Sequence, residues 1–202
     1  MNGAHRALLG VVCVAGLLAG SRVGWAQQAG RPVAVGIAVG GTMPLSDFAN
    51  DTKTGAHGAA FVQYEPARGI WGVRGEVGYH RSQLTDEALG AVGAGPDDKV
   101  NHGITTVGAT ALLIGNRRDR SVTPYLLGGL GLYRLTVSRT AGSASQSESE
   151  NGFGFSGGAG VRLGRGIGLF AEVRFHQFSI TPSGTTDAST YQMIPVTIGL
   201  RF

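Results

Sequence analysis

The sequence predicts an all-β protein, an eight-stranded antiparallel up-and-down β-barrel that spans a membrane. Three observations lead to this fold. First, the segment Tyr191–Phe202 alternates apolar residues with Gly, Thr and Pro, which is the two-residue period of a strand with one apolar face. Second, eight such segments follow one another, with connections that alternate between long and short. Third, no apolar run after residue 26 is long enough for a membrane-spanning helix, so only a closed barrel satisfies the backbone in lipid.

The first 26 residues are typical of a secretory signal peptide, which we expect to be cleaved after Ala26. Arg6 ends a short polar region, and the apolar stretch Ala7–Gly20 that follows is too short to span a membrane as a helix. A lipoprotein signal would use Cys13, but valines precede it where a small residue is needed. The mature chain, 27–202, is expected to form a single barrel domain.

The composition excludes several classes of protein. The chain has 35 glycines without a triplet repeat, which excludes collagen, and its 42% hydrophobic and 15% charged residues are unlike a disordered chain. The net charge of +4 falls to +2 once Arg6 and Arg22 leave with the leader. The basic residues are scattered, so no nucleic-acid partner is expected. With Cys13 as the only cysteine, no disulfide framework is possible.

Four strands are expected in the first half of the mature chain. From Val33 to Gly40, branched residues alternate with Ala and Gly, so the branched side chains are expected outside and the small ones inside. The segment Ile70–His80 is the clearest, with apolar and aromatic residues on one face and charged residues on the other. The segment His102–Ile114 has an ambiguous face pattern. The remaining strand of this half is expected at Ala56–Glu65. The expected connections are Leu45–Gly55, Pro66–Gly69 and Arg81–Asn101.

Four more strands are expected in the second half. On Val122–Val137 the lipid-facing side is expected to hold Tyr125 and Tyr133, which leaves Arg134 pointing inward. A low-complexity polar loop is expected at Ser138–Asn151. The other strands are Phe153–Arg162, Leu169–His176 and Tyr191–Phe202, and the other connections are Asn116–Arg120, Leu163–Gly166 and Ser179–Thr190. Alternation of short turns and long loops is typical of outer-membrane barrels, and a soluble sandwich has no reason to show it.

Two pairs of aromatic residues recur at a spacing of eight on the faces assigned to lipid. They are Trp71 with Tyr79 and Tyr125 with Tyr133. A tilted strand rises roughly 2.3–2.7 Å per residue along a barrel axis, so eight residues span about 20 Å, close to the ~25 Å apolar band of such barrels. The pairs therefore predict an aromatic girdle at each membrane interface, although chance spacing remains an alternative for either pair alone.

The mature chain as a whole resembles the small eight-stranded bacterial outer-membrane β-barrels, the family of the OmpA transmembrane domain, OmpX and the opacity proteins. The resemblance is carried by the segments Val73–Tyr79, Thr123–Tyr133, Phe170–Phe175 and Ile194–Phe202. It implies a barrel with both termini in the periplasm and an aromatic last residue, Phe202, that is read by the barrel-assembly machinery. The alternative is that Phe202 only ends an edge strand of a soluble sheet. The family has no common catalytic site to carry over.

The face opposite the lipid is expected to carry a network of charged residues inside the barrel. The lumen of an eight-stranded barrel is just wide enough for side chains to fill, and buried charges must pair. We expect Glu76 and Glu172 to be bridged by Arg74, Arg162 and Arg174. The predicted lumen set is Arg74, Glu76, His80, Arg134, Arg162, Glu172, Arg174 and His176. A path for protons or ions is the alternative to a structural network.

The sequence shows no catalytic site, cofactor motif or metal-ligand spacing, so none of these is expected. The predicted function is that of a non-enzymatic outer-membrane protein, which contributes to envelope integrity or to surface interaction through its extracellular loops. Its expected partners are outer-membrane lipids, the assembly machinery, and a possible extracellular ligand or host surface. The alternatives are a narrow channel for small solutes, an outer-membrane lipid-modifying enzyme, and a soluble lipocalin-like binding barrel.

Overall fold

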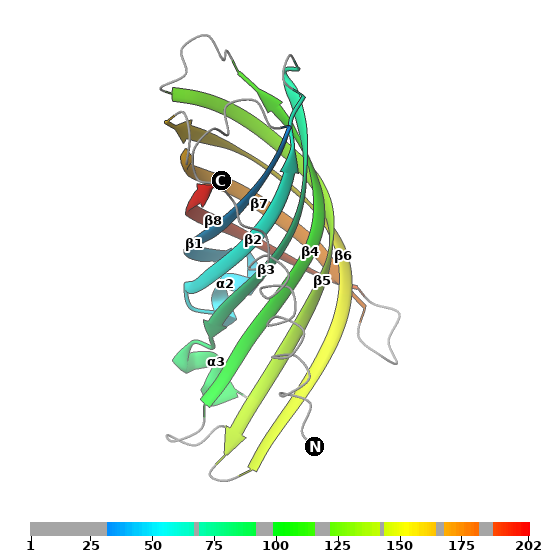
Figure 1. The fold of residues 1–202 in the computed structure, drawn as a ribbon. Helices are drawn as coiled ribbons and strands as arrows, with labels where there is room; N and C mark the ends of the chain where they lie inside the picture. Colours follow the sequence, from blue (N-terminus) through cyan, green and yellow to red (C-terminus); the bar gives the residue numbers. More distant parts are fainter. Residues whose placement is uncertain are drawn as a thin grey trace.

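A computed structural model describes residues 32–66, 69–91, 99–115, 122–141, 144–164, 168–181 and 188–202. In this part of the chain, eight antiparallel strands close into one barrel, each pairing with the next in sequence and the last pairing with the first (Figure 1). The predicted fold is confirmed, and the predicted leader lies outside the described residues. The elements are β1 Val33–Leu45, α2 Asp47–Asp51, β2 Gly55–Tyr64, β3 Trp71–Gln83, α3 Asp86–Ala91, β4 Lys99–Ile114, β5 Val122–Ala141, β6 Ala144–Leu163, β7 Gly168–Ile180 and β8 Ser189–Arg201.

The strands lean because the pairing register advances around the barrel. Paired residues followed from Ala34 through all eight strands return to β1 at Pro44, ten residues further on. A stagger of this size tilts the strands by roughly 40° from the barrel axis. A row of paired residues is therefore oblique to the barrel axis. Followed from β1 to β8, it moves along the axis toward the end of the barrel at which β1 ends.

The outer surface is apolar along most of the strands, and the inner surface holds small, polar and aromatic side chains. On β1, Ile37 and Val39 are exposed outward, whereas Ala34 and Ala38 are buried inside, as predicted. An outer band of exposed apolar residues is what a barrel in lipid presents. Other members of this band are Val62, Val73, Val77, Val107, Leu126, Leu130, Leu132, Phe153, Val173 and Ile198.

Glycine makes room for the rings that fill the lumen. At three positions a glycine lies directly against an inward-pointing ring, and an added Cβ atom would overlap with that ring. The pairs are Gly36 with Phe61, Gly160 with Tyr125, and Gly199 with Phe170. Much of the glycine in the strands therefore serves the close packing of a narrow interior rather than turns.

The predicted polar loop at Ser138–Asn151 is wrong, because most of it is strand. Strands β5 and β6 are 20 residues long each and pair in register as far as Ala141 and Ala144. The resulting hairpin extends past α3 at the end of the barrel that carries both helices (Figure 1). Cross-strand hydroxyl contacts accompany the backbone pairing, such as Thr136 to Ser149 at 2.9 Å. Because both faces of this hairpin are polar, no alternation of hydrophobicity shows that it is strand.

Two short helices occupy the connections predicted at Leu45–Gly55 and Arg81–Asn101. Phe48 of α2 is buried, with its ring edge-on to Tyr191 at 5.4 Å and stacked on His102 at 6.2 Å between centroids. It joins a cluster of inward apolar residues and covers this end of the lumen. Neither helix, nor any other among the described residues, has the length and apolar character to cross a membrane.

Candidate functional site

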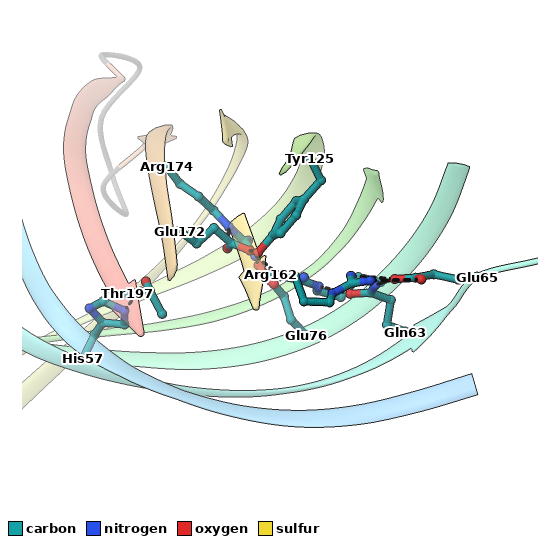
Figure 2. A network of polar contacts seen from close by, with 10 residues as sticks. His57, Gln63, Glu65, Glu76, Tyr125, Arg162, Glu172, Arg174 and Thr197 are labelled. Carbon is teal, nitrogen blue, oxygen red and sulfur yellow. Dashed lines mark hydrogen bonds and ion pairs between the residues drawn. The ribbon is translucent and has the colours of Figure 1, made fainter. Parts of the chain in front are cut away.

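The centre of the lumen holds a chain of paired charges that comes from two strands, β3 and β7, with a tyrosine from a third. Arg74 of β3 lies 2.8 Å from a carboxylate oxygen of Glu172 on β7, and both residues are only 3% exposed. Tyr125 of β5 donates a hydrogen bond of 2.8 Å to the same oxygen. Arg174 forms ion pairs with both Glu172 and Glu76. Figure 2 shows Tyr125, Glu172, Arg174 and Glu76 converging in the interior, so each buried charge meets an opposite charge.

A second group of charges lies near the end of the lumen where the short turns are, and it adds charges from β6 and β8. Arg162 of β6 forms a fork to Glu65, with distances of 2.7 Å and 3.2 Å to the two carboxylate oxygens. Arg201 of β8 approaches the same carboxylate at 3.4 Å. Gln63 links the two groups, because it donates to Glu65 and accepts a hydrogen bond of 2.7 Å from Arg74 (Figure 2). The two groups therefore form one continuous network.

Aromatic rings enclose the guanidinium group of Arg74. Its central carbon lies 4.3 Å from the centroid of Phe61 and 5.8 Å from that of Phe170. A guanidinium over an aromatic face is attracted by the ring quadrupole, and more strongly where water is excluded. The rings therefore hold Arg74 in place and separate its charge from water.

Three histidines form a layer between the charges and the helix-bearing end. The rings of His57 and His80 stack at 4.9 Å, and His176 lies 6.2 Å from His80. Thr42 is 3.1 Å from His57 and 2.8 Å from His80, and Thr197 is 2.9 Å from His57. His176 has its own hydroxyl partner, Tyr133, at 2.8 Å. These hydroxyl contacts satisfy the imidazoles inside the barrel.

Apolar side chains fill the lumen beyond the histidine layer. The buried cluster there consists of Phe48, Ile104, Tyr133, Leu135, Phe178, Ile180 and Met193. A cavity of about 40 Å³ lies among the charge network and the histidine layer, and its lining includes the ring of Phe61 as well as His80, Glu76 and Arg174. Such a cavity has room for roughly three water molecules. The interior is therefore packed over most of its length.

The fold and this interior agree with a known family. The model of the family described as "Outer membrane protein beta-barrel domain" matches residues 10–202. The chain belongs to this family. It is therefore a small outer-membrane β-barrel protein, and its exposed apolar band faces lipid.

Solved structures of other outer-membrane barrels are similar in fold. Neisserial surface protein A matches with a TM-score of 0.55 and 18% identity, over 84% of this chain and 96% of that chain. The attachment invasion locus protein of Yersinia pestis, solved with the heparin analogue sucrose octasulfate, matches with a TM-score of 0.52 and 18% identity, over 84% of this chain and 97% of that chain. A major outer membrane protein from Thermus thermophilus matches with a TM-score of 0.53 and 12% identity, over 84% of this chain and 98% of that chain. The sequence has no match among curated proteins.

One predicted lumen placement and one predicted ion pair need correction in this outer-membrane barrel. Arg134, predicted in the lumen, is exposed on the outside of β5. Arg162, predicted to bridge Glu76 and Glu172, pairs instead with Glu65 near the turns. The other predicted lumen residues are inside, and the structure brings Arg74, Glu76, Glu172 and Arg174 together in one group and His80 and His176 in another.

The girdle predicted for β5 is wrong, because Tyr125 and Tyr133 are each 3% exposed and point into the lumen. The outward residues in the middle of this strand include the leucines Leu126, Leu130 and Leu132. Both faces of β5 are thus rich in apolar residues, so the sequence pattern does not show which face meets lipid. The tyrosines face inward because their hydroxyl groups find partners there, Glu172 and His176.

The girdle residues predicted on β3 do point outward. Trp71 is 49% and Tyr79 is 52% exposed, at opposite ends of the membrane-facing part of the strand. Phe202 exchanges two backbone hydrogen bonds with Val35 of β1, at 2.8 Å and 3.2 Å. The last residue therefore takes part in closing the barrel.

Sequence reasoning missed several members of the interior network. Gln63 and Glu65 lie on one face of the segment Ala56–Glu65, opposite Val62 and Tyr64, and this alternation indicates their inward position. The partner of each charge is not accessible to such reasoning, because it depends on the register between strands. Among the described residues, no group of three or more His, Cys, Asp or Glu side chains is arranged to hold a metal ion.

The inward position of Tyr125 leads to a stability prediction. We expect Tyr125→Phe to lower the free energy of unfolding by roughly 1.5–3 kcal/mol, because it removes a hydrogen bond to a buried carboxylate. Urea unfolding in detergent micelles measures this change. The matched control is Tyr79→Phe, which removes an outward hydroxyl and should change stability by less than about 0.5 kcal/mol. Equal effects of the two substitutions would contradict the placement.

Proposed function

We propose that this outer-membrane barrel is a non-enzymatic envelope protein that acts through its extracellular end, in membrane integrity or in surface interaction. The observation that carries the proposal is the filled lumen. Charge pairs such as Arg74–Glu172 and Arg162–Glu65 cross the interior, and an apolar cluster closes one end. A barrel with this interior offers its outer surfaces, rather than a passage, for function.

The narrow channel is the second candidate, and the cavity of about 40 Å³ beside the charged and histidine side chains favours it. Conduction would require a continuous path of water, and therefore the separation of Arg174 from Glu76 and Glu172. Breaking buried ion pairs is costly unless water replaces every lost partner. The closed barrel is therefore preferred.

Two features argue against a lipid-modifying enzyme and against a soluble binding barrel. All four histidines in the described part of the chain, His57, His80, His102 and His176, lie on inward positions, so none of them can serve as a base at the lipid-facing surface. This argues against the enzyme. A lipocalin-like binder would need a large ligand cavity and a polar outer surface, whereas this barrel has a filled interior and an apolar outer band.

The long β5–β6 hairpin and the two helices lie at the same end of the barrel (Figure 1). Outer-membrane barrels have short periplasmic turns and longer extracellular loops, so we place this end outside the cell. The attachment invasion locus protein was solved with a polysulfated ligand. The hairpin here carries Glu148 and Glu150, which repel polyanions, so we expect its ligand to be different in charge.

The proposed biogenesis uses both ends of the chain. The leader of residues 1–26 takes the protein across the inner membrane and is removed after Ala26. Phe202, which pairs with Val35 at the closing seam, then serves as the signal to the barrel-assembly machinery. Lipids of the outer membrane surround the apolar band of the folded barrel.

The proposed closed state is tested by conductance. Purified protein inserted into a planar lipid bilayer should show no steady ion current, because the charge network and apolar cluster leave no continuous water path. A known porin in the same bilayer provides the positive control. A large and steady current through the wild-type protein would reject this proposal in favour of the channel.

The proposed orientation is tested by thiol labelling. Cys13, the only cysteine, lies in the proposed leader, so single-cysteine variants of the mature chain are uniquely reactive. A membrane-impermeant maleimide added to intact cells should label Ser147→Cys on the β5–β6 hairpin. It should not label Asp119→Cys, between β4 and β5, until the outer membrane is broken. Labelling of Asp119→Cys alone in intact cells would show the opposite orientation.

A further inference from the structure

Two arginines stand on the outer surface of the barrel near its extracellular end. Arg81 of β3 and Arg134 of β5 are both exposed, on the outward face of their strands. Neither has an ion-pair partner among the described residues. Tyr79 lies on the same face of β3, two residues before Arg81, and is 52% exposed.

The register places the two arginines at the same height on the barrel wall. Tyr79 pairs with Thr105, and Thr105 with Arg134, so Arg134 lies two strands along the row that starts at Tyr79. With a tilt of roughly 40° and strands about 4.8 Å apart, the two strand spacings from Tyr79 to Arg134 correspond to a rise of about 6 Å along the barrel axis. Arg81 lies two residues up β3 from Tyr79, a climb of about 5 Å. The two Cα atoms are therefore level and about 12 Å apart around the barrel, within reach of one shared ligand.

The phenol of Tyr79 lies between them. Arg81 pairs with Gly103 on β4, and the ring of Tyr79 covers this glycine. A Cβ atom at Gly103 would be 2.7 Å from the Tyr79 hydroxyl oxygen. Because Gly103 lies above Tyr79 on the tilted wall, the ring points up toward the level of the arginines. Because residue 103 is a glycine, the phenol ring of Tyr79 can occupy the space that a side chain there would fill.

The three side chains stand at the upper border of the apolar band. The row immediately below Tyr79 is Val77, Val107 and Leu132, all paired in register and all exposed. Outward positions at the level of the arginines on other strands carry no charge. By the same register these positions are Met43, Ala56, Asn151, Ser179 and Gln192. The positive charge is therefore confined to the sector of β3 to β5.

We propose that Arg81, Tyr79 and Arg134 bind a headgroup phosphate of a phosphorylated glycolipid in the outer leaflet. Two guanidinium groups and one hydroxyl stand as donors at one level of the same outer face, within reach of one ligand, which suits the several acceptor oxygens of a phosphate. The apolar row of Val77, Val107 and Leu132 lies directly below, where the acyl chains of the same lipid extend. The positive charge of the two arginines and their position at the border of the apolar band thus fit one lipid whose anionic headgroup lies at this level of the membrane.

The test measures lipid retention by the purified full-length protein in detergent. Native mass spectrometry counts the molecules of phosphorylated lipid A, and of its phosphatase-treated form, that stay bound. The variant is Arg81→Gln with Arg134→Gln. The control is Arg139→Gln, which removes the same charge from β5 where the strand has passed beyond the band. The heat-dependent gel shift of each variant verifies that the barrel is folded.

Wild type and Arg139→Gln should retain the phosphorylated lipid, and the double variant should bind it roughly tenfold or more weakly, as the loss of charge-assisted hydrogen bonds implies. The phosphatase-treated lipid should bind all three proteins equally weakly. Equal retention of both lipids by wild type, or equal retention by the double variant and Arg139→Gln, would overturn the proposal. The proposal rests on the orientation proposed above, but retention in detergent does not depend on orientation, so the two can fail separately.

Discussion

Glu172→Ala is expected to destabilise the barrel by roughly 3–5 kcal/mol, which is the typical cost of removing one partner from a buried ion pair. Glu172 accepts from Arg74, Arg174 and Tyr125, and it is buried almost completely. Without it, the side-chain oxygen of Gln63 is the one acceptor that the described residues still offer to Arg74. Urea unfolding of the protein in detergent or lipid vesicles measures the loss.

Two further measurements separate the possible responses to this substitution. Glu148→Ala removes the same group from the exposed hairpin and should cost less than about 0.5 kcal/mol. If water enters the site vacated by Glu172, the loss of stability is smaller and an ion current appears in the planar bilayer. If Glu172→Ala neither lowers stability nor produces an ion current, then the ion pairs of Glu172 do not stabilise the closed lumen.

Ile37→Arg is expected to cost roughly 2–4 kcal/mol, as charges at the midplane of outer-membrane barrels do. Ile37 is 57% exposed in the middle of the apolar face of β1, between Val35 and Val39. The arginine would face hydrocarbon, far from either interface. Unfolding from lipid vesicles is the relevant measurement, since detergent gives the charge more access to water.

The matched control for this substitution is Ser147→Arg, on the exposed hairpin between β5 and β6. An arginine there meets water and should change stability by less than about 0.5 kcal/mol. Comparable costs at residues 37 and 147 would mean that the lipid-facing band and the hairpin have been assigned to the wrong surroundings.

The faces of β1, β3, β7 and β8 are predictable from sequence for one reason. In each strand the small or charged residues alternate with apolar ones, as with Arg74 beside Val73, so the polar partner must point away from lipid. On β5 this contrast is absent. Leu126 and Leu127 are equally apolar, and one points outward while the other points inward. The hydroxyl groups of Tyr125 and Tyr133 decide the direction through partners on other strands.

The partners inside the lumen are less predictable than the faces. Alternation says that Arg162 and Glu172 point inward, but it does not say at which depth. Depth depends on the stagger of the strands, which brings Glu172 to Arg74 across the interior and leaves Arg162 beside Glu65. The extended hairpin was missed for a related reason, because backbone pairing between polar strands produces no hydrophobic pattern to read.

The contact of glycines with lumen rings restricts the order in which substitutions can accumulate during evolution. Any side chain at Gly160 collides with Tyr125 unless the tyrosine has first become smaller, and a smaller residue at 125 on its own leaves a void and removes a hydrogen bond from Glu172. The same steric conflict holds for Gly36 with Phe61, whereas an added Cβ atom at Gly199 would also overlap with the backbone oxygen of Ile37, which a smaller residue in place of Phe170 does not relieve. Homologous barrels should therefore change Gly160 with Tyr125, and Gly36 with Phe61, in pairs, with the bulky residue moved from one strand to its neighbour, and should keep glycine at residue 199.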